Sequence, residues 1–347
     1  MWNFIGDAPF KFSSLWFFWL SYCSLHYLTN YLQIIKFVFF GRWIIYNQFC
    51  CMWQQYLQQI QQGNIKTLAR CISLIENEVA GYEQLLQLLP LSITPVIGIT
   101  GPPGAGKSTL VDALIGHITQ QGKKIGILCI DPSSPFNLGA LLGDRIRMSE
   151  WYNNPNVYIR SLATRGALGG LHPKIIEISD LLKAASFDYI LVETVGVGQS
   201  EIEIAGLADT TVVVVVPESG DEIQTMKAGL MEIADLFVVN KADRADADMF
   251  VKNLRLMLAP AFSNKQIEIA VIKTVATQKK GISALFEAIE IHINHHTKND
   301  KKLWLLAEKA FHLIQQKKMA DINKAVLKEK IAAAGNNFNL YKFIQNY

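Results

Sequence analysis

Residues 99–116 read ITGPPGAGKSTLVDALIG: an apolar run, a glycine-rich turn, a lysine, two hydroxyl residues and apolar residues at helical spacing. Glycines let backbone N–H groups turn toward a phosphate, and a helix N-terminus adds a favourable field for an anion. Lys107 is placed to reach terminal phosphates, and the hydroxyl of Ser108 suits a magnesium ion. The segment therefore predicts a loop that binds nucleotide phosphates between a strand and a helix.

The spacing Gly-x4-Gly-Lys-Ser, from Gly101 to Ser108, is a complete Walker A pattern. The alternative, a glycine turn that merely precedes a helix, is disfavoured because a strand-like run stands before it and a helix-like pattern after it. The predicted nucleotide-binding residues of this loop are Gly101, Gly104, Ala105, Gly106, Lys107, Ser108 and Thr109.

Apolar runs and helix-like segments alternate through the middle of the chain. The predicted strands are 95–100, 124–131, 156–162, 188–194, 210–217, 235–243 and 267–276, with helices over 107–121 and 172–185. Several of these strands are apolar along their whole length, which is typical of a parallel sheet buried on both faces. The pattern predicts an α/β fold, a P-loop NTPase with a doubly wound, mostly parallel sheet and helical N- and C-terminal extensions.

We expect the P-loop domain over 95–297, a helical region over 52–94 with a break at Gly63-Asn64, and a C-terminal helical arm over 298–347. An apolar stripe runs along the arm. It is typical either of a helix packed on the core or of a dimerisation arm, and periodicity does not separate the two. The stripe consists of Leu303, Leu306, Ala310, Leu313 and Ile314.

Residues 1–51 differ from the rest, with 17 of the 36 aromatic residues and no charged residue from Phe12 to Ile35. The segment is long enough for a membrane helix, which takes about 20 apolar residues. A signal peptide fits poorly, because no basic n-region or small-residue cleavage site is visible. Translated sequence upstream of a true start at Met52 is the third interpretation, and the one we favour.

The net charge of +3 comes with no long Lys/Arg block, so nothing in the sequence favours a nucleic-acid partner. Five cysteines show neither metal-ligand spacing nor a disulfide framework. That usage is typical of a reducing compartment and predicts a cytoplasmic protein, with a membrane partner only if residues 1–51 belong to it.

Asn240-Lys241-Ala242-Asp243 ends an apolar run far downstream of the Walker A pattern and predicts a guanine-binding loop. The Asp243 carboxylate would accept two N–H bonds from guanine, whereas adenine would leave it unpaired at a cost of about 1–3 kcal/mol. Asn240 would brace the loop, and the Lys241 stem would cover the base. A backbone N–H after the last strand, from Ala276, is placed to reach guanine O6.

Asp131 and Glu193 both end predicted strands, at the sheet edge where doubly wound folds bind ligands. Mg²⁺ prefers hard oxygen ligands. The predicted magnesium set is therefore Ser108 with one or more of Asp131, Asp144 and Glu193, directly or through water. For each carboxylate the alternative is a helix cap or a solvated loop residue.

Several motifs occur in one order and together resemble the MeaB/ArgK family of P-loop GTPases, over about residues 53–295. They are GPPGAGKST (101–109), DPSSP (131–135), GDRIRM (143–148), TRGALGG (164–170), ETVGVGQSE (193–201), GDEIQTMKAG (220–229) and NKAD (240–243). The resemblance implies that Asp131, Asp144 and Glu193 surround Mg²⁺. It also implies switch segments over 131–144 and 193–201 and a third mobile loop over 220–229.

The resemblance further implies catalytic roles for Lys107, Glu193 and Lys227, the last being similar to a lysine implicated in partner-stimulated hydrolysis. It implies a homodimer that binds GTP or GDP, hydrolyses GTP and acts as a chaperone of an adenosylcobalamin-dependent acyl-CoA mutase of the methylmalonyl-CoA mutase type. Such a protein gates cofactor loading and protects the mutase without binding cobalamin itself. A metallochaperone GTPase and a transport-associated kinase are the alternatives.

Residue-level reasoning adds three expectations. Glu193-x-x-Gly196 lacks a glutamine directly after the glycine, with Gln199 three places on, so we expect slow intrinsic hydrolysis. The neighbouring His292, His295 and His296 are expected to form a solvated helix end rather than a metal site. The arginines that could approach phosphate are expected to form surface salt bridges; they are Arg145, Arg147, Arg160 and Arg165.

Overall fold

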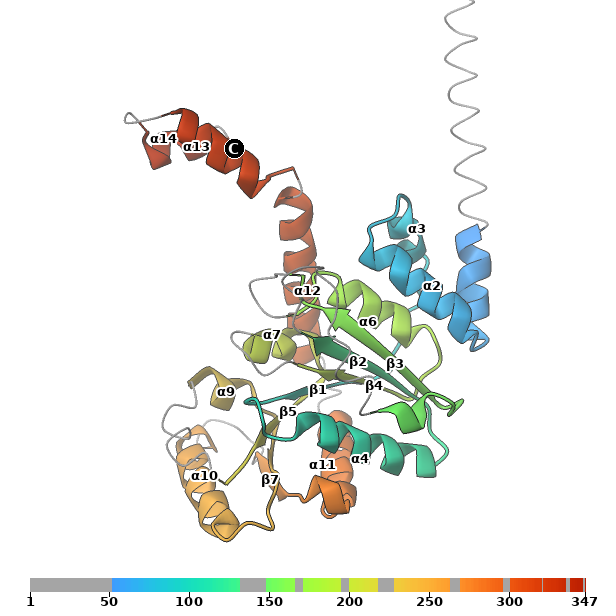
Figure 1. Ribbon diagram of the computed structural model, residues 1–347, viewed down its shortest axis with the longest axis vertical. Helices are drawn as coiled ribbons and strands as arrows, with labels where there is room; N and C mark the ends of the chain where they lie inside the picture. Colours follow the sequence, from blue (N-terminus) through green and yellow to red (C-terminus); the bar gives the residue numbers. More distant parts are fainter. Residues whose placement is uncertain are drawn as a thin grey trace, which may run out of the picture.

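Seven parallel strands form one sheet in the order β3-β2-β4-β1-β5-β6-β7 in the computed structural model (Figure 1). The structure describes residues 52–131, 148–165, 171–194, 200–217, 228–262, 269–295, 300–319, 321–334, 338–345 and 347. The strands are β1 Val96–Thr100, β2 Ile125–Asp131, β3 Val157–Ala163, β4 Tyr189–Glu193, β5 Thr210–Val215, β6 Leu236–Val239 and β7 Ala270–Lys273. The predicted α/β class and parallel sheet are confirmed.

Burial explains which strands were easy to predict. Every residue of β1, β2, β4, β5 and β6 is buried, because helices cover both faces of the central sheet. The edge strands β3 and β7 are only partly buried, which matches the weaker apolar pattern of β3. The last two strands are shorter than predicted, because the chain leaves the sheet after Val239 and Lys273.

Two helical layers enclose the sheet. On one face, α4 (Lys107–Gln120) and α11 (Ile282–His295) bury Leu114 and Phe286 against β1 and β5. On the other face lie α6 (Ile175–Lys183) and α7 (Ser200–Leu207), with α9 (Ala228–Ile233) and α10 (Ala247–Phe262) over β5, β6 and β7. Because β1 is central, the loop that follows it opens at the middle of the sheet's carboxyl edge.

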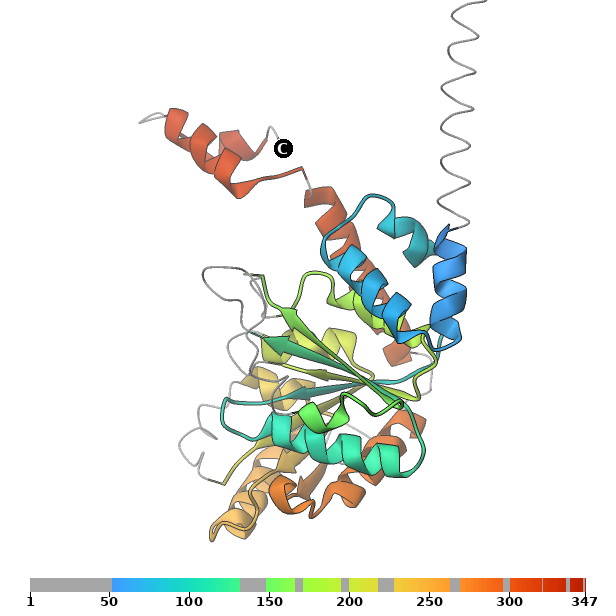
Figure 2. The ribbon, with the colours of Figure 1, turned by 45° about the vertical axis from the view of Figure 1, so that its right-hand side comes forward.

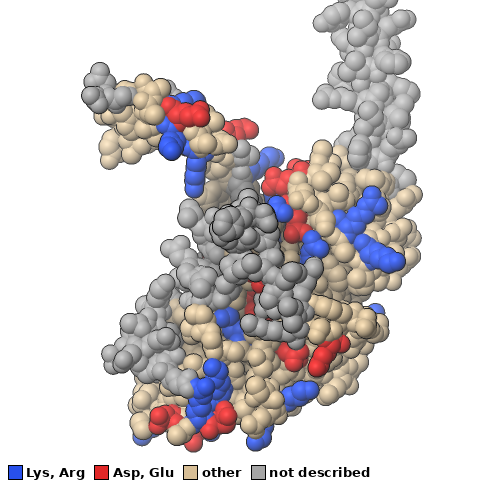
Figure 3. Space-filling model, viewed as in Figure 1, with Lys and Arg blue, Asp and Glu red and all other residues tan. Residues whose placement is uncertain are grey.

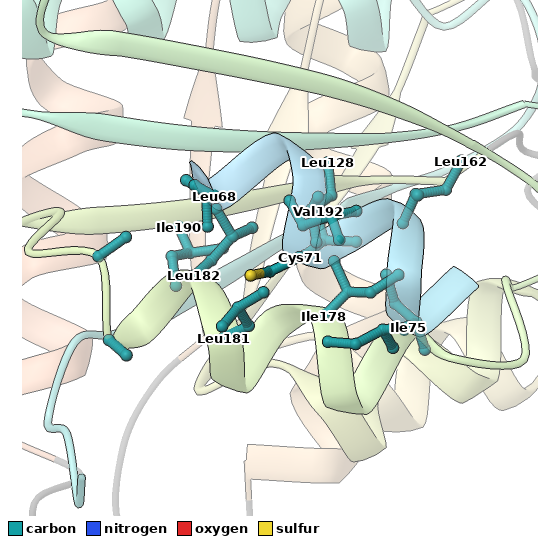
Figure 4. Packing of buried hydrophobic residues seen from close by; sticks show 14 of the residues in the cluster. Leu68, Cys71, Ile75, Leu128, Leu162, Ile178, Leu181, Leu182, Ile190 and Val192 are labelled. Carbon is teal, nitrogen blue, oxygen red and sulfur yellow. The ribbon is translucent and has the colours of Figure 1, made fainter. Parts of the chain in front are cut away.

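The N-terminal helical region packs on α6. Its helices are residues 52–61, α2 (Ile65–Glu76) and α3 (Tyr82–Gln87). Side chains of α2 pack against those of α6, β2, β3 and β4 in a buried apolar cluster shown in Figure 4. The predicted break at Gly63-Asn64 is confirmed, and the Asn64 side chain caps α2. A second break at Asn77–Gly81, where Val79 is exposed, was not predicted from the sequence.

The C-terminal region consists of α12 (Asp300–Met319), α13 (Lys324–Ala333) and α14 (Leu340–Ile344). α12 packs against α7, whereas α13 and α14 project away from the sheet in both ribbon views (Figures 1 and 2). In the predicted stripe, Leu303, Leu306 and Ile314 are more than half exposed. The stripe is therefore largely uncovered within one chain.

Among the described residues, no helix combines the length and apolar character needed to cross a membrane. On the face shown in Figure 3, basic and acidic side chains of the described residues are interspersed. The described part of this face therefore carries no broad patch of one sign.

His172 lies buried just before α6, where the N-terminal region meets the sheet. Its Nδ1 accepts a hydrogen bond from the Lys174 N–H at 3.0 Å. Burial, together with the charges of Arg165, Lys174 and Arg160, lowers the pKa of His172 from 6.5 to about 4. The side chain is therefore neutral at physiological pH.

We predict that this histidine makes folding sensitive to acid. A lowered pKa in the folded state means that stability is fully present above pH 6.5 and is lost as the pH falls toward 4. The shift corresponds to about 3 kcal/mol in the free energy of unfolding. Urea unfolding between pH 7 and pH 4.5 should show this loss, and His172→Gln should remove much of it. Replacing the exposed His312 by glutamine is the control, and an equal acid loss in both variants would contradict the prediction.

Candidate functional site

The glycine-rich loop after β1 adopts a backbone that only glycine permits at its key positions. Gly101 and Gly106 have φ angles of 138° and 86°. A Cβ at Gly101 would lie 2.1 Å from the Val214 carbonyl oxygen, and one at Gly106 would lie 2.5 Å from Asn240 Nδ2. The loop thus lies close to β5 and to the predicted base loop, and α4 begins directly after it at Lys107.

The Lys107 ammonium lies inside the loop that it follows. Its Nζ donates to the carbonyl oxygens of Gly101 at 2.8 Å and Pro102 at 3.1 Å. The residue is buried, so its charge is held in a fixed place beside the N-terminus of α4. A cation and a helix N-terminus at one point favour the binding of an anion such as phosphate.

Glu193 and Asp131 lie at the carboxyl ends of adjacent strands. The register pairs Cys129 of β2 with Glu193 of β4, so Asp131 lies two residues further along β2. Both acids are only 4% exposed, and the Ser108 hydroxyl donates to Glu193 Oε1 at 2.7 Å. One hydroxyl and two carboxylates supply the hard oxygen donors that Mg²⁺ prefers, so the residues present fit that ion. Asp144, Lys227 and Gln199 lie outside the described residues.

Asn240 connects the base loop to the phosphate loop. Its Nδ2 donates to the Ala105 carbonyl oxygen at 3.0 Å. Its Oδ1 accepts from Thr274 Oγ1 at 3.1 Å and from the Ala276 N–H at 3.2 Å. The side chain is 2% exposed, so these bonds are shielded from water. The structure thus brings the two predicted loops and the segment after β7 together around one amide.

The chain turns sharply after Asn240. Lys241 has a φ angle of 54°, which is uncommon for a residue with a Cβ, and the Ala242 N–H donates to the Thr274 carbonyl oxygen at 3.0 Å. The turn leaves Asp243 exposed beside the loop that carries Ala276. Thr274 was missed by the sequence reasoning, because a threonine at a strand end carries no distinctive signal.

Of the other candidates, His292, Arg160 and Arg165 belong to the scaffold. His292 was expected on a solvated helix end, which is wrong: it is buried, with Nδ1 2.8 Å from Thr210 Oγ1 and Nε2 3.3 Å from Asp235 Oδ1. No group of three or more His, Cys, Asp or Glu suited to a metal occurs in the described parts of the chain, and His296 lies outside them. Arg160 and Arg165 contact the end of α2. Arg145 and Arg147 also lie outside the described residues.

Known proteins are similar to this chain in sequence or in fold. A Pyrococcus abyssi protein whose name assigns it to the GTPases is 49% identical over 249 residues, which is 70% of this chain and 76% of that protein. The mouse methylmalonic aciduria type A homolog, a mitochondrial protein, is 37% identical over 212 residues, 55% of this chain and 51% of its own. The crystal structure of a protein described as an LAO/AO transport system kinase matches with a TM-score of 0.58 at 24% identity. It covers 85% of this chain and 96% of that one, and the likeness shows a shared fold.

The family model described as methylmalonyl-CoA mutase-associated GTPase MeaB matches residues 68–331. This range takes in the glycine-rich loop, both strand-end carboxylates and the loop that carries Asn240 and Asp243. The chain therefore belongs to the MeaB family of GTPases and is a GTP hydrolase.

Proposed function

We propose that this GTPase acts as a chaperone of an adenosylcobalamin-dependent acyl-CoA mutase of the methylmalonyl-CoA mutase type, and controls the loading and protection of its cofactor. The description of the family and the name of the mouse relative support this partner. The structural observation behind the proposal is the Asn240 side chain, which bonds the base loop to the phosphate loop. Because the two loops are bonded to each other, a change at the phosphates would also affect the loop at the base. A nucleotide-dependent switch requires this kind of coupling.

For the base we propose guanine. The exposed Asp243 carboxylate would accept the N1–H and 2-amino N–H groups, and the aliphatic stem of Lys241 would lie over the ring. The Ala276 N–H already donates to Asn240 Oδ1, so a bond to guanine O6 would be shared between two acceptors. Such three-centre bonds are common at helix termini, and Ala276 is the first residue of a short 3₁₀ helix over Ala276–Gln278.

For the phosphates we propose that Lys107 and the N–H groups of the glycine loop bind the terminal groups. Ser108, Asp131 and Glu193 would hold Mg²⁺, with Asp144 as a further ligand. A bound magnesium ion neutralises charge on the phosphates. The Ser108–Glu193 hydrogen bond holds both side chains together before the ion arrives. Lys227 is proposed, from family resemblance, to act when a partner stimulates slow intrinsic hydrolysis.

We also propose a homodimer in a reducing, cytoplasmic setting. The exposed apolar side chains of α12 are the surface that a second copy would cover, since such a stripe is costly to leave in water. They are Leu303, Leu306, Phe311 and Ile314. Cys71 and Cys129 are buried thiols, which supports that setting.

Asp243→Asn should change the nucleotide preference. The amide presents a donor where guanine also presents donors, so GTP affinity should fall about 10- to 100-fold. Xanthosine triphosphate, which carries a carbonyl at C2, should gain affinity. Titration calorimetry with both nucleotides measures this, with the nearby exposed Asp246→Asn as the matched control. Unchanged GTP affinity, or equal affinity of the unaltered protein for ATP and GTP, would contradict the base assignment.

The partner should change the rate of GTP hydrolysis. We expect a purified adenosylcobalamin-dependent methylmalonyl-CoA mutase to raise the GTPase rate at saturating GTP by about tenfold, a change of roughly 1.4 kcal/mol in the barrier. Asp243→Asn supplied with xanthosine triphosphate should respond in the same way, which separates partner contact from base recognition. If the rate stays constant and the two proteins do not co-elute with GTP or GDP, the chaperone proposal fails.

A further inference from the structure

The end of α2 contacts β3 and the residues that follow it through both the side chain and the backbone of Glu76. The Glu76 carboxylate forms an ion pair with Arg160 of β3. The Glu76 carbonyl oxygen accepts a hydrogen bond from Arg165 Nη1 at 2.7 Å, just past the end of β3. Glu76 of the helical region thus contacts both Arg160 and Arg165.

The stretch between these two arginines aligns the end of β2. The register pairs Leu128 with Arg160 and Asp131 with Ala163. Beyond the last pair, the Thr164 N–H donates to the Asp131 carbonyl oxygen at 3.0 Å. The backbone of Asp131 is therefore held by Ala163 and Thr164, which lie between the two arginines that Glu76 contacts.

The Arg160 contact is largely shielded from water, whereas the Arg165 contact lies at the surface. The Arg160 and Glu76 side chains are 22% and 10% exposed, so water and salt screen their charges less than at a free surface. Arg165 has a φ angle of 48°, a left-handed conformation that persists in a residue with a Cβ only where its surroundings impose it. Its guanidinium also lies at the C-terminal end of α2, where a positive charge is favoured.

The helix that carries Glu76 is itself fixed. Leu68, Cys71 and Ile75 of α2 pack between α6 and side chains of β2, β3 and β4 in Figure 4. Glu76 follows Ile75 directly, so its position is set by this buried layer rather than by a free loop.

We infer that Glu76 and Arg165 are positioning residues for magnesium binding: they hold the end of β3, and through Thr164 the end of β2, so that the Asp131 carboxylate stays in place. This inference rests on the proposed assignment of Asp131 to the magnesium site. The N-terminal helical region then contributes to GTPase function, because a displacement of α2 would lower the affinity of the site for Mg²⁺.

Glu76→Ala and Glu78→Ala form a matched pair. Glu76 is the last residue of α2 and Glu78 lies two positions beyond it. Both pair with a cation of the domain, but the partner of Glu78 is Lys174, which directly precedes α6 and belongs neither to β3 nor to the residues that follow β3. The measurement is the dissociation constant of a fluorescent GDP analogue with and without Mg²⁺. Mutation of a residue that orients a metal ligand typically lowers the metal affinity or the activity by 10- to 100-fold. For Glu76→Ala we expect the enhancement by Mg²⁺ to fall about tenfold while metal-free affinity is retained, and Glu78→Ala should match the unaltered protein.

Arg165→Gly covers the case in which Glu76→Ala does not fold, since glycine keeps the left-handed backbone without strain and lacks the guanidinium. It should show the same loss, and added Mg²⁺ should restore its GTPase rate. A folded Arg165→Gly with the normal enhancement by Mg²⁺ would overturn the inference. If Mg²⁺ does not enhance GDP binding to the unaltered protein, the proposed magnesium site fails instead.

Discussion

The hydrogen bonds of Asn240 are the interaction on which the site depends. This one buried amide joins the Ala105 carbonyl of the phosphate loop to Thr274 and Ala276 of the segment after β7. Gly106 has to be glycine because the amide approaches so closely. An unsatisfied buried polar group costs about 1–3 kcal/mol, so the three segments are held together whenever Asn240 is in place.

The parallel sheet brings the segments that Asn240 joins to one edge of the domain. Parallel strands bring their carboxyl ends to one edge, so Thr100, Asp131, Glu193 and Asn240 come from four strands that are far apart in sequence. The Thr194 N–H donates to the Ile99 carbonyl oxygen at 3.0 Å, and the Thr194 hydroxyl donates to Thr100 Oγ1 at 2.9 Å. These two bonds connect the end of β4 to the start of the phosphate loop. A nucleotide at this edge meets groups from several strands, and the helical region reaches the same edge through β3.

Local chemistry explains what sequence alone could and could not predict. A glycine-rich turn and strands made almost entirely of apolar residues leave strong signals in the sequence, and the phosphate loop and the sheet were predicted from them. His292 lies near the end of α11, shortly before a polar stretch of sequence, and only the tertiary structure shows that it faces Thr210 and Asp235. The contacts of Glu76 with Arg160 and Arg165 join residues more than 80 positions apart, which no spacing rule detects.

The Asn240 amide couples the base loop to the phosphate loop. Comparing GDP with inorganic pyrophosphate on Asn240→Ala by calorimetry tests this most directly. Both ligands should bind more weakly, each by about tenfold, because about 1.4 kcal/mol of binding free energy is lost when the two loops are no longer bonded to each other. A variant that folds normally and loses affinity for GDP alone would show that Asn240 serves only the base, and would contradict the coupling of the two loops.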